Sequence, residues 1–465
     1  MRWGLLLVMV LLACSCTQPA AVAAKPTPTG PISLSGTIGK AGYVIDVAAG
    51  WNGTLFLYSH GYVAPGSANP AQDAPLSQAR DWLLAHHFAM AGSSYSSTGW
   101  ALEDAFKDQV ALLDYFGSHV AKPKQVIAWG VSLGGIITAG LVQLYPGRFA
   151  AAMPLCGVLA GGIATWNTEL DAAYAFKTLF APASGLEIVH ITNGANNLRE
   201  AESLFTVAAQ SAKGRARLAL IAALTDLPGW FDPIKPEPAS TDYAAQLTAQ
   251  ESWESRVDFP FAFEYRTDLE KRAGGNPSWN IGVDYAGQLA ESPDASEVAA
   301  LYRAAGLSLT TDLRMLNAGA RITPDASAAA YLQRYVTFDG RLSVPVLTIH
   351  TTGDGLVIPP NESAYGQVVG VAGDGDLLRQ LFVHRAGHCA FTPAEVIAGL
   401  QVLLSRLDTG RWDGAALQPP ALNAAATAQG ASLNGFFGFS EPPAFVAYQP
   451  APYPRPFNAG STIPA

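Results

Sequence analysis

The sequence predicts an α/β fold: a mostly parallel β-sheet covered by helices on both faces, with a large, mainly helical insertion. Two observations support this prediction. Up to residue 157, short apolar strand patterns alternate with amphipathic helical patterns, which is typical of a parallel sheet whose strands are joined by crossing helices. The alternation then stops, and strand patterns return only at Val344. Residues 158–340 are therefore expected to form a cap inserted between two strands of one sheet.

The first part of the chain supplies strands and helices in turn. The expected strands are Tyr43–Val47, Thr54–Tyr58, Phe88–Gly92, Gln125–Trp129 and Phe149–Leu155. Ser77–His87 and Gly99–Phe116 lie between them and carry apolar residues on one side at helical spacing. Ile136–Leu144 is a third expected helix, which follows a glycine-rich turn.

Within the cap, helical patterns such as Ala201–Ala212 and Arg215–Leu224 are separated by loops with scattered aromatic residues. After the cap, the strands Val344–His350 and Leu381–His384 and the helix Pro393–Leu407 continue the earlier pattern. A helical cap thus interrupts a single sheet.

Domain boundaries follow from this pattern. Residues 32–157 and 341–410 are expected to form one α/β core, with the cap, residues 158–340, between its two parts. Residues 411–465 are rich in proline and aromatic side chains. Because they are too apolar for a solvated tail, we expect an extended strap packed on the body, with disorder as the alternative.

The N-terminus, residues 1–24, is predicted to be a signal peptide or a lipoprotein signal with a tether. The apolar run Leu5–Leu12 follows Arg2 and is too short to span a bilayer as a helix. Leu11-Leu-Ala-Cys14 resembles a bacterial lipobox, which would leave Cys14 lipidated, whereas Ala21-Val-Ala23 would suit ordinary signal peptidase cleavage. The mature protein is expected outside the cytoplasm, secreted or lipid-anchored at a bacterial cell surface or in the periplasm.

Composition restricts the partners. The net charge is −9 and no segment gathers lysine and arginine, so a nucleic-acid partner is not expected. In the body of the protein the sequence has only two cysteines, Cys156 and Cys389. They are open to two interpretations: a disulfide formed in an oxidising compartment, or two buried thiols.

Gly130-Val-Ser132-Leu-Gly134 follows an expected strand and precedes an expected helix. This is the pattern of a nucleophile elbow, a tight turn with serine at its tip. Glycine is needed on both sides because the strand and helix backbones pass close together there. The turn presents the Ser132 hydroxyl to the helix N-terminus, where N–H groups favour a developing anion. An ordinary glycine-rich turn is the alternative.

A serine nucleophile needs a general base that is held by an acid. Asp354 lies on a glycine-flanked turn just past one expected strand, and His388 lies just past the next. Both are predicted to be catalytic, in the chain order Ser, Asp, His. A turn-forming aspartate is the alternative for Asp354. His384 is the rival histidine, but it falls inside a strand pattern.

An oxyanion intermediate needs two N–H donors. The backbone of Leu133 is one expected donor, and Tyr62, in the loop after an early strand, is the other. His60 in the same loop is expected to brace it by hydrogen bonds. None of the histidines has metal-ligand spacing to another ligand residue, so no metal site is predicted.

Taken together, His60-Gly61, the Ser132 turn, Asp354 and His388 resemble the α/β-hydrolase superfamily over roughly residues 40–157 and 341–408. The resemblance implies a serine hydrolase that works through an acyl-enzyme without metal or organic cofactor. The cap and the cysteine after His388 also resemble the feruloyl esterase and tannase group.

That group differs from this chain at one position. Its members have a cysteine directly before the serine, bridged to the cysteine after the histidine, whereas this chain has Val131. We therefore expect Cys156 to be the partner of Cys389, which would anchor the histidine loop to the sheet.

The expected function is that of an exported carboxylic-ester hydrolase. Its substrate would be a small-molecule or polymeric ester, with an apolar or aromatic part bound by the cap. A prolyl-type serine peptidase with the same fold and triad is the alternative, and Glu103 and Asp104 could then anchor a peptide terminus. A non-catalytic surface binding protein is a third hypothesis.

Overall fold

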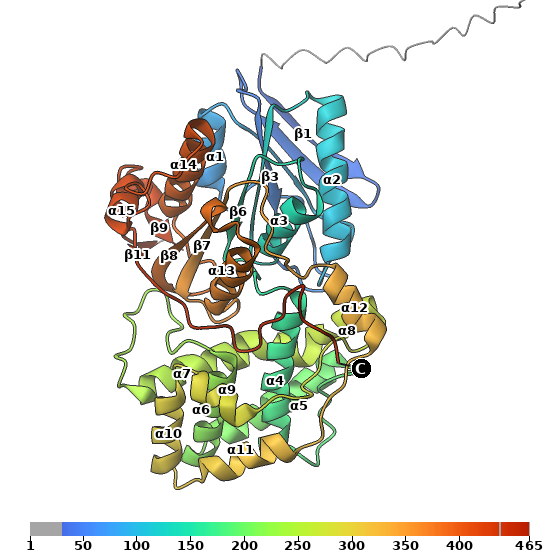
Figure 1. Ribbon diagram of the computed structural model, residues 1–465, viewed down its shortest axis with the longest axis vertical. Helices are drawn as coiled ribbons and strands as arrows, with labels where there is room; N and C mark the ends of the chain where they lie inside the picture. The colour runs from blue at the N-terminus through green and yellow to red at the C-terminus, as the bar shows by residue number, and fades with distance from the viewer. Residues whose placement is uncertain (1–29, 437–438, 465) are drawn as a thin grey trace, which may run out of the picture.

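The computed structural model describes residues 30–436 and 439–464, and within these residues nine strands form one sheet (Figure 1). Their order across the sheet is β1-β2-β4-β3-β5-β6-β7-β8-β11. From β4 through β8 neighbouring strands are parallel, while β1, β2 and β11 join the edges antiparallel. The strands are β1 (Ile32–Ile38), β2 (Ala41–Val47), β3 (Thr54–Ser59), β4 (Ala89–Ser93), β5 (Gln125–Val131), β6 (Ala151–Leu155), β7 (Val346–Gly353), β8 (Leu378–Ala386) and β11 (Phe445–Val446).

Helices cover both faces of the sheet because its central strands are buried on both sides. In β3, Leu55 and Leu57 pack with α2 and α3, whereas Phe56 and Tyr58 face the core shared with α1 and α14. The predicted α/β fold is confirmed. The helices of the core are α1 (Ser77–Ala85), α2 (Leu102–His119), α3 (Leu133–Leu144), α13 (Pro360–Ala372), α14 (Pro393–Thr409) and α15 (Pro419–Thr427).

Two elements differ from the sequence-based expectation for clear reasons. Strand β1 was not among the expected strands, although Ile32, Leu34 and Ile38 alternate with polar residues; it lies at the sheet edge, where five of its seven residues are exposed. Helix α3 begins at Leu133, three residues before the predicted start. Its first turn contains Gly134 and Gly135, which sequence propensity disfavours. The close approach of the backbone requires them, since a Cβ on Gly135 would lie 2.4 Å from the Cα of Gly157.

The segment between β6 and β7 folds into a helical layer below the sheet in Figure 1. It has its own apolar core, to which α4, α5, α6 and α10 contribute. Its helices are α4 (Gly162–Phe180), α5 (Gly194–Ala209), α6 (Ala212–Thr225), α7 (Tyr243–Trp253), α8 (Arg266–Ala273), α9 (Tyr285–Glu291), α10 (Ala295–Ala304), α11 (Leu309–Ala318) and α12 (Ala326–Arg334).

The C-terminal segment is more structured than the extended strap expected. It forms helix α15, adds β11 to the sheet edge beside β8, and pairs the short strands β9 (Gly435–Phe436) and β10 (Phe439–Ser440). Its last part is extended and buries Tyr453 and Phe457 against the rest of the protein.

The targeting segment and Cys14 lie outside the described residues. No helix among the residues that are described is long and apolar enough to cross a membrane.

Candidate active site

Ser132 occupies a sharp turn between β5 and α3. Its φ of 58° and ψ of −124° place a non-glycine residue in strained backbone space, and its N–H donates to the Leu155 carbonyl at 3.0 Å. A Cβ on Gly134 would lie 1.9 Å from the carbonyl oxygen of Ser59, and one on Gly130 would lie 2.5 Å from the same oxygen. The two glycines therefore allow the close approach on which the turn depends.

The structure brings Asp354 and His388 to this serine. Asp354 follows the last residue of β7, and His388 lies two residues beyond β8. His388 Nδ1 is 2.8 Å from Asp354 Oδ2, and its Nε2 is 2.8 Å from Ser132 Oγ. The three side chains form one hydrogen-bonded series, although Ser132 and His388 are 256 positions apart in the chain.

Asp354 is held rigidly. It is fully buried, and its Oδ1 accepts hydrogen bonds from the N–H groups of Leu356 and Val357, each at 3.0 Å. Oδ2 therefore remains for the imidazole. The rival His384 is not part of the series: its side chain is 46% exposed and lies near Glu237.

Tyr62 and Leu133, the expected oxyanion donors, line one small cavity together with Ser132. Gly61 brings the first loop close to the serine, since a Cβ there would lie 3.3 Å from Ser132 Cβ. His60 stacks on Tyr95, with ring centroids 4.1 Å apart, and its Nδ1 is 2.7 Å from the Gly61 carbonyl. Burial lowers the pKa of His60, so a neutral ring stabilises the loop.

Cys156 and Cys389 are joined by a disulfide, with their Cα atoms 5.4 Å apart. The bond links the end of β6 to the residue after His388. Among the described residues, these cysteines and His388 are the only group of three His, Cys, Asp or Glu residues close enough to hold one metal ion. Because both sulfur atoms are in the disulfide, they are not available as thiolate ligands.

The cap closes over the serine with aromatic side chains. Trp166 and Phe261 from the cap, with Trp100 from the core, line the cavity that contains Ser132. Tyr62 packs against Phe261, with ring centroids 5.0 Å apart. The scattered cap aromatics of the sequence thus include two residues of the site.

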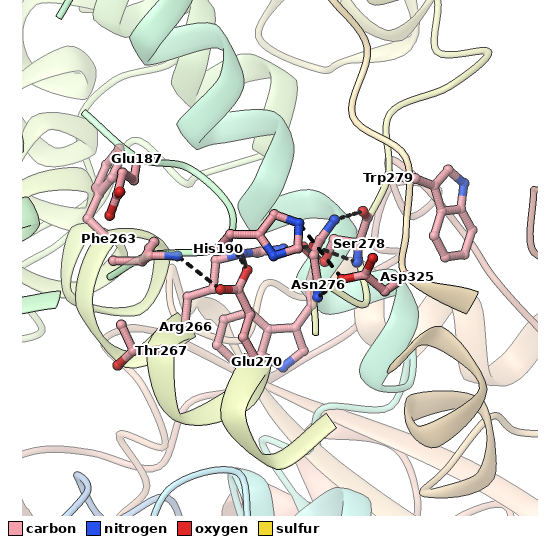
Figure 2. Close-up of polar contacts among 12 residues, drawn as sticks. Glu187, His190, Phe263, Arg266, Thr267, Glu270, Asn276, Ser278, Trp279 and Asp325 are labelled. Carbon is pink, nitrogen blue, oxygen red and sulfur yellow. Dashed lines mark hydrogen bonds and ion pairs between the residues drawn. The ribbon is translucent and has the colours of Figure 1, made fainter. Parts of the chain in front are cut away.

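A polar network behind this wall stabilises α8 (Figure 2). The Arg266 guanidinium donates to Glu270 at 3.1 Å and to Asn276 at 2.8 Å, and it lies 5.9 Å from the Trp166 ring. Glu270 in turn accepts the N–H groups of His190 and Ile191. The network joins the α4–α5 connection to α8. It therefore stabilises the part of the cap that carries Trp166, on the side away from the cavity.

Three acidic residues of the cavity walls are not singled out by sequence analysis: Glu169, Glu254 and Asp258. The sequence contains only a weak indication of these residues. Glu254 and Asp258 are like charges spaced four residues apart in an otherwise aromatic-rich segment, so on a helix they share one face. They lie at the two ends of a π-helical turn, a feature often found at functional sites.

The strand order, together with a serine turn after β5 and the Asp and His loops after β7 and β8, decides the architecture. This is an α/β-hydrolase fold. The resemblance predicted from the sequence is therefore confirmed at the level of the fold.

Comparisons with known proteins find hydrolases among the similar proteins. No protein-family model matches the chain. The o-phthalyl amidase of Xanthobacter agilis is 28% identical over 428 residues, which cover 85% of this chain and 91% of the amidase.

Solved structures are more distant. A serine hydrolase from Cycloclasticus zankles is 14% identical with a TM-score of 0.34, covering 77% of this chain and 92% of that one. Feruloyl esterase B from Aspergillus oryzae is 12% identical with a TM-score of 0.38, covering 82% and 80%.

Proposed function

We propose that the protein is a serine hydrolase that cleaves carboxylic esters through an acyl-enzyme. Ser132 is the nucleophile, His388 is the general base and acid, and Asp354 orients the imidazole. The observation that carries the proposal is the unbroken series of 2.8 Å contacts from Asp354 Oδ2 through His388 to Ser132 Oγ.

The geometry supports a two-step reaction. As Ser132 Oγ attacks the ester carbonyl carbon, its proton passes to His388 Nε2, and the imidazolium is stabilised by Asp354. The proton then goes to the departing alcohol, which leaves an acyl group on Ser132. In the second step His388 takes a proton from water as the water oxygen attacks the acyl carbon, and it returns that proton to Ser132 Oγ as the bond from the serine to the acyl group breaks and the acid leaves. The N–H groups of Leu133 and Tyr62 are the proposed donors to the oxyanion in both steps.

Amide cleavage is the second candidate, and the similarity to an amidase over 85% of the chain favours it. The triad chemistry is the same, with an amine in place of the alcohol as leaving group. A peptide-terminus anchor at Glu103 and Asp104 is not favoured, because Glu103 pairs with Lys107 at 2.7 Å and Asp104 pairs with Arg272 at 3.2 Å. Measuring kcat/KM for an ester and an amide that share one acyl group would show which of the two activities is greater.

Labelling by a fluorophosphonate probe tests the proposal. We expect the wild-type protein to be labelled and to hydrolyse p-nitrophenyl esters. Ser132→Ala should abolish labelling and lower kcat by at least about 10⁴-fold. Ser118→Ala, on the exposed end of α2, is the matched control and should behave as wild type. Labelling that persists in Ser132→Ala would contradict the proposal, and an unlabelled wild-type protein without hydrolase activity would favour a binding protein.

Export with lipidation at Cys14 is also proposed, on the basis of the Leu11-Leu-Ala-Cys14 sequence. Mass spectrometry of the mature N-terminus, after expression in a bacterial host with the full leader, would test it. A diacylglyceryl group on Cys14 is the expected result, and Cys14→Ser should release the protein from the membrane fraction. A mature protein that begins after Ala23 would show ordinary secretion instead.

A further inference from the structure

Three carboxyl groups of the cap face a cavity next to the serine. Glu254 and Asp258, from the π-helical turn Glu254–Asp258, line one compartment, and Ser132 lines the neighbouring one. Glu169 of α4 lines both. The two compartments also share Val158, Thr165, Leu356 and Val357. A ligand portion that extends from the serine into the cap would therefore reach the three carboxyl groups.

Each of these carboxyl groups has at least one buried oxygen without a hydrogen-bond partner among the described residues. Glu254 is 2% exposed, and no group among the described residues donates a hydrogen bond to either of its carboxyl oxygens. Asp258 Oδ2 and Glu169 Oε2 are likewise buried without a partner in the part of the chain that the structure describes. Leaving a buried polar group unsatisfied destabilises a protein. Three such groups on one cavity indicate that something outside the chain satisfies them.

One cation lies near the cluster, but no hydrogen bond joins it to the three carboxyl groups. Arg266 donates through Nε to Glu270 and through Nη2 to Asn276 (Figure 2). Its Nη1 is buried without a partner among the described residues, and its charge opposes the rise in the pKa of Glu169, so Arg266 offsets part of the charge of that one carboxyl group. The other charged neighbours are acidic and engaged elsewhere: Glu251 pairs with Arg215, and Asp354 with His388. Tyr453, which also lines the cavity, lies against Thr168, and burial raises the pKa of its hydroxyl to about 12.

We propose that Glu169, Glu254 and Asp258 form a subsite for a protonated amino group of the substrate. This inference rests on the proposed hydrolase function and narrows its substrate class to esters or amides that carry an alkylammonium group. An ammonium group has three donors and a positive charge, which match carboxyl oxygens that have no donors of their own. The cavity walls also contain Ile221, Phe259 and Phe263, which suit the alkyl stem of such a ligand.

A bare metal ion fits less well. Hard cations need several oxygen ligands converging on one point. Among the described residues, these three carboxylates do not form a group whose ligand atoms all lie within 4.8 Å of one another. An ammonium group does not need all three at once, because hydrogen bonds to one or two of these carboxylates and the charge of the remaining one at longer range still favour it.

The protonation of the three carboxyl groups gives the proposal a pH signature. Burial raises the pKa of Glu169 to about 8 and raises the pKa values of Glu254 and Asp258 well above the ordinary range. Before a cation binds, the three carboxyl groups are therefore largely neutral near pH 7. A cation favours the ionised carboxylate, so its binding releases a proton, and its affinity should rise with pH between 6 and 8.

Competition between n-butylammonium, 1-butanol and n-butyrate tests the subsite. Each is added as an inhibitor of p-nitrophenyl acetate hydrolysis by the full chain at pH 6, 7 and 8, where the ammonium stays charged. We expect butylammonium to inhibit at least about tenfold more strongly than butanol, with butyrate the weakest. The ratio of ammonium to alcohol affinity should increase from pH 6 to pH 8. Equal inhibition by ammonium and alcohol, or a ratio that does not change with pH, would overturn the inference.

Variants locate the effect. Glu254→Gln and Asp258→Asn should each reduce the ammonium preference by at least about fivefold, because a neutral amide replaces the charge. Glu202→Gln, an exposed acid on α5, is the matched control and should keep the wild-type preference. Thermal unfolding shows whether each variant is folded. If a variant does not fold, the inhibition of the wild-type protein measured from pH 6 to pH 8 still tests the subsite. A preference that survives both cavity substitutions would refute this location.

Calorimetry on Ser132→Ala separates the two proposals. If butylammonium binds this variant but the wild-type protein neither hydrolyses esters or amides nor reacts with fluorophosphonate, the subsite stands and the hydrolase proposal fails. If the wild-type protein is labelled and active but shows no ammonium preference, the hydrolase proposal stands and the subsite fails.

Discussion

Buried carboxylates are treated differently in the α/β core and at the cap cavity. In the core, Asp354, Glu362 and Glu395 are fully buried, and each accepts several hydrogen bonds. Glu395 accepts both nitrogens of Arg385, at 2.8 and 3.1 Å, and two backbone N–H groups. Glu362 accepts from Thr348 at 2.6 Å and contacts His350 at 3.1 Å. These acids hold loops and strands in place.

At the cap cavity, Glu169, Glu254 and Asp258 have carboxyl oxygens with no donor among the described residues. The cap is able to satisfy a buried acid, because Asp312 is paired with Arg217 at 2.7 Å and Asp171 with Arg455 at 3.1 Å. Missing partners are not confined to the cavity, since Glu297 Oε1 in α10 also lacks one among the described residues, but three of these acids gather on the cavity walls. The comparison teaches that a carboxylate bonded within the chain builds the site, while an unpaired one on its wall is available to a ligand.

The largest effect should come from the core acid that contacts the histidine. Asp354→Asn should lower kcat by about 10³–10⁴-fold, because an amide does not hold His388 in the tautomer that accepts the serine proton. Glu362→Gln, at another fully buried core acid, should mainly lower stability. Steady-state kinetics and thermal unfolding of both variants measure the difference. Equal kcat losses in the two variants would remove the special role of Asp354.

A core acid can also be left without its partner. Arg385→Met leaves Glu395 buried without its cation and should lower the free energy of unfolding by about 3–5 kcal/mol. Arg148→Met, which breaks the exposed pair with Asp114, should cost less than about 1 kcal/mol. Denaturant unfolding of the two variants measures both values. A small loss in Arg385→Met would mean that the core tolerates an unpaired acid as the cap cavity does.

The smallest effect is expected in the pH dependence of stability. Because the pKa of Glu169 is raised from 4.5 to about 8, the folded state binds more protons than the unfolded state between these values, and stability falls as the pH rises through this window. Glu169→Gln should remove most of that fall between pH 5 and pH 8. Urea unfolding at several pH values measures it, with Glu202→Gln as control. An unchanged slope would indicate that Glu169 is already ionised.

Much of the core could be predicted because its signals are local. Strand β5, the glycines around Ser132 and the start of α14 at Pro393 are visible as short patterns with physical causes. Strand β1 and helix α15 were not predicted. Strand β1 has the alternation of a strand, at Ile32, Leu34 and Ile38, but it is a mostly exposed edge strand. Helix α15 is a short alanine-rich helix, Pro419–Thr427, in a segment whose proline content suggested an extended chain.

By itself the sequence determined the fold class and the order Ser132, Asp354, His388, because each residue follows a strand whose apolar pattern is local. Only the tertiary structure decided what surrounds them. It bonded Cys156 to Cys389 across 233 positions and brought Glu169 to the same cavity as Glu254 and Asp258. Packing of the cap helices sets those distances, and no periodicity in a single segment records whether a buried carboxylate finds a partner.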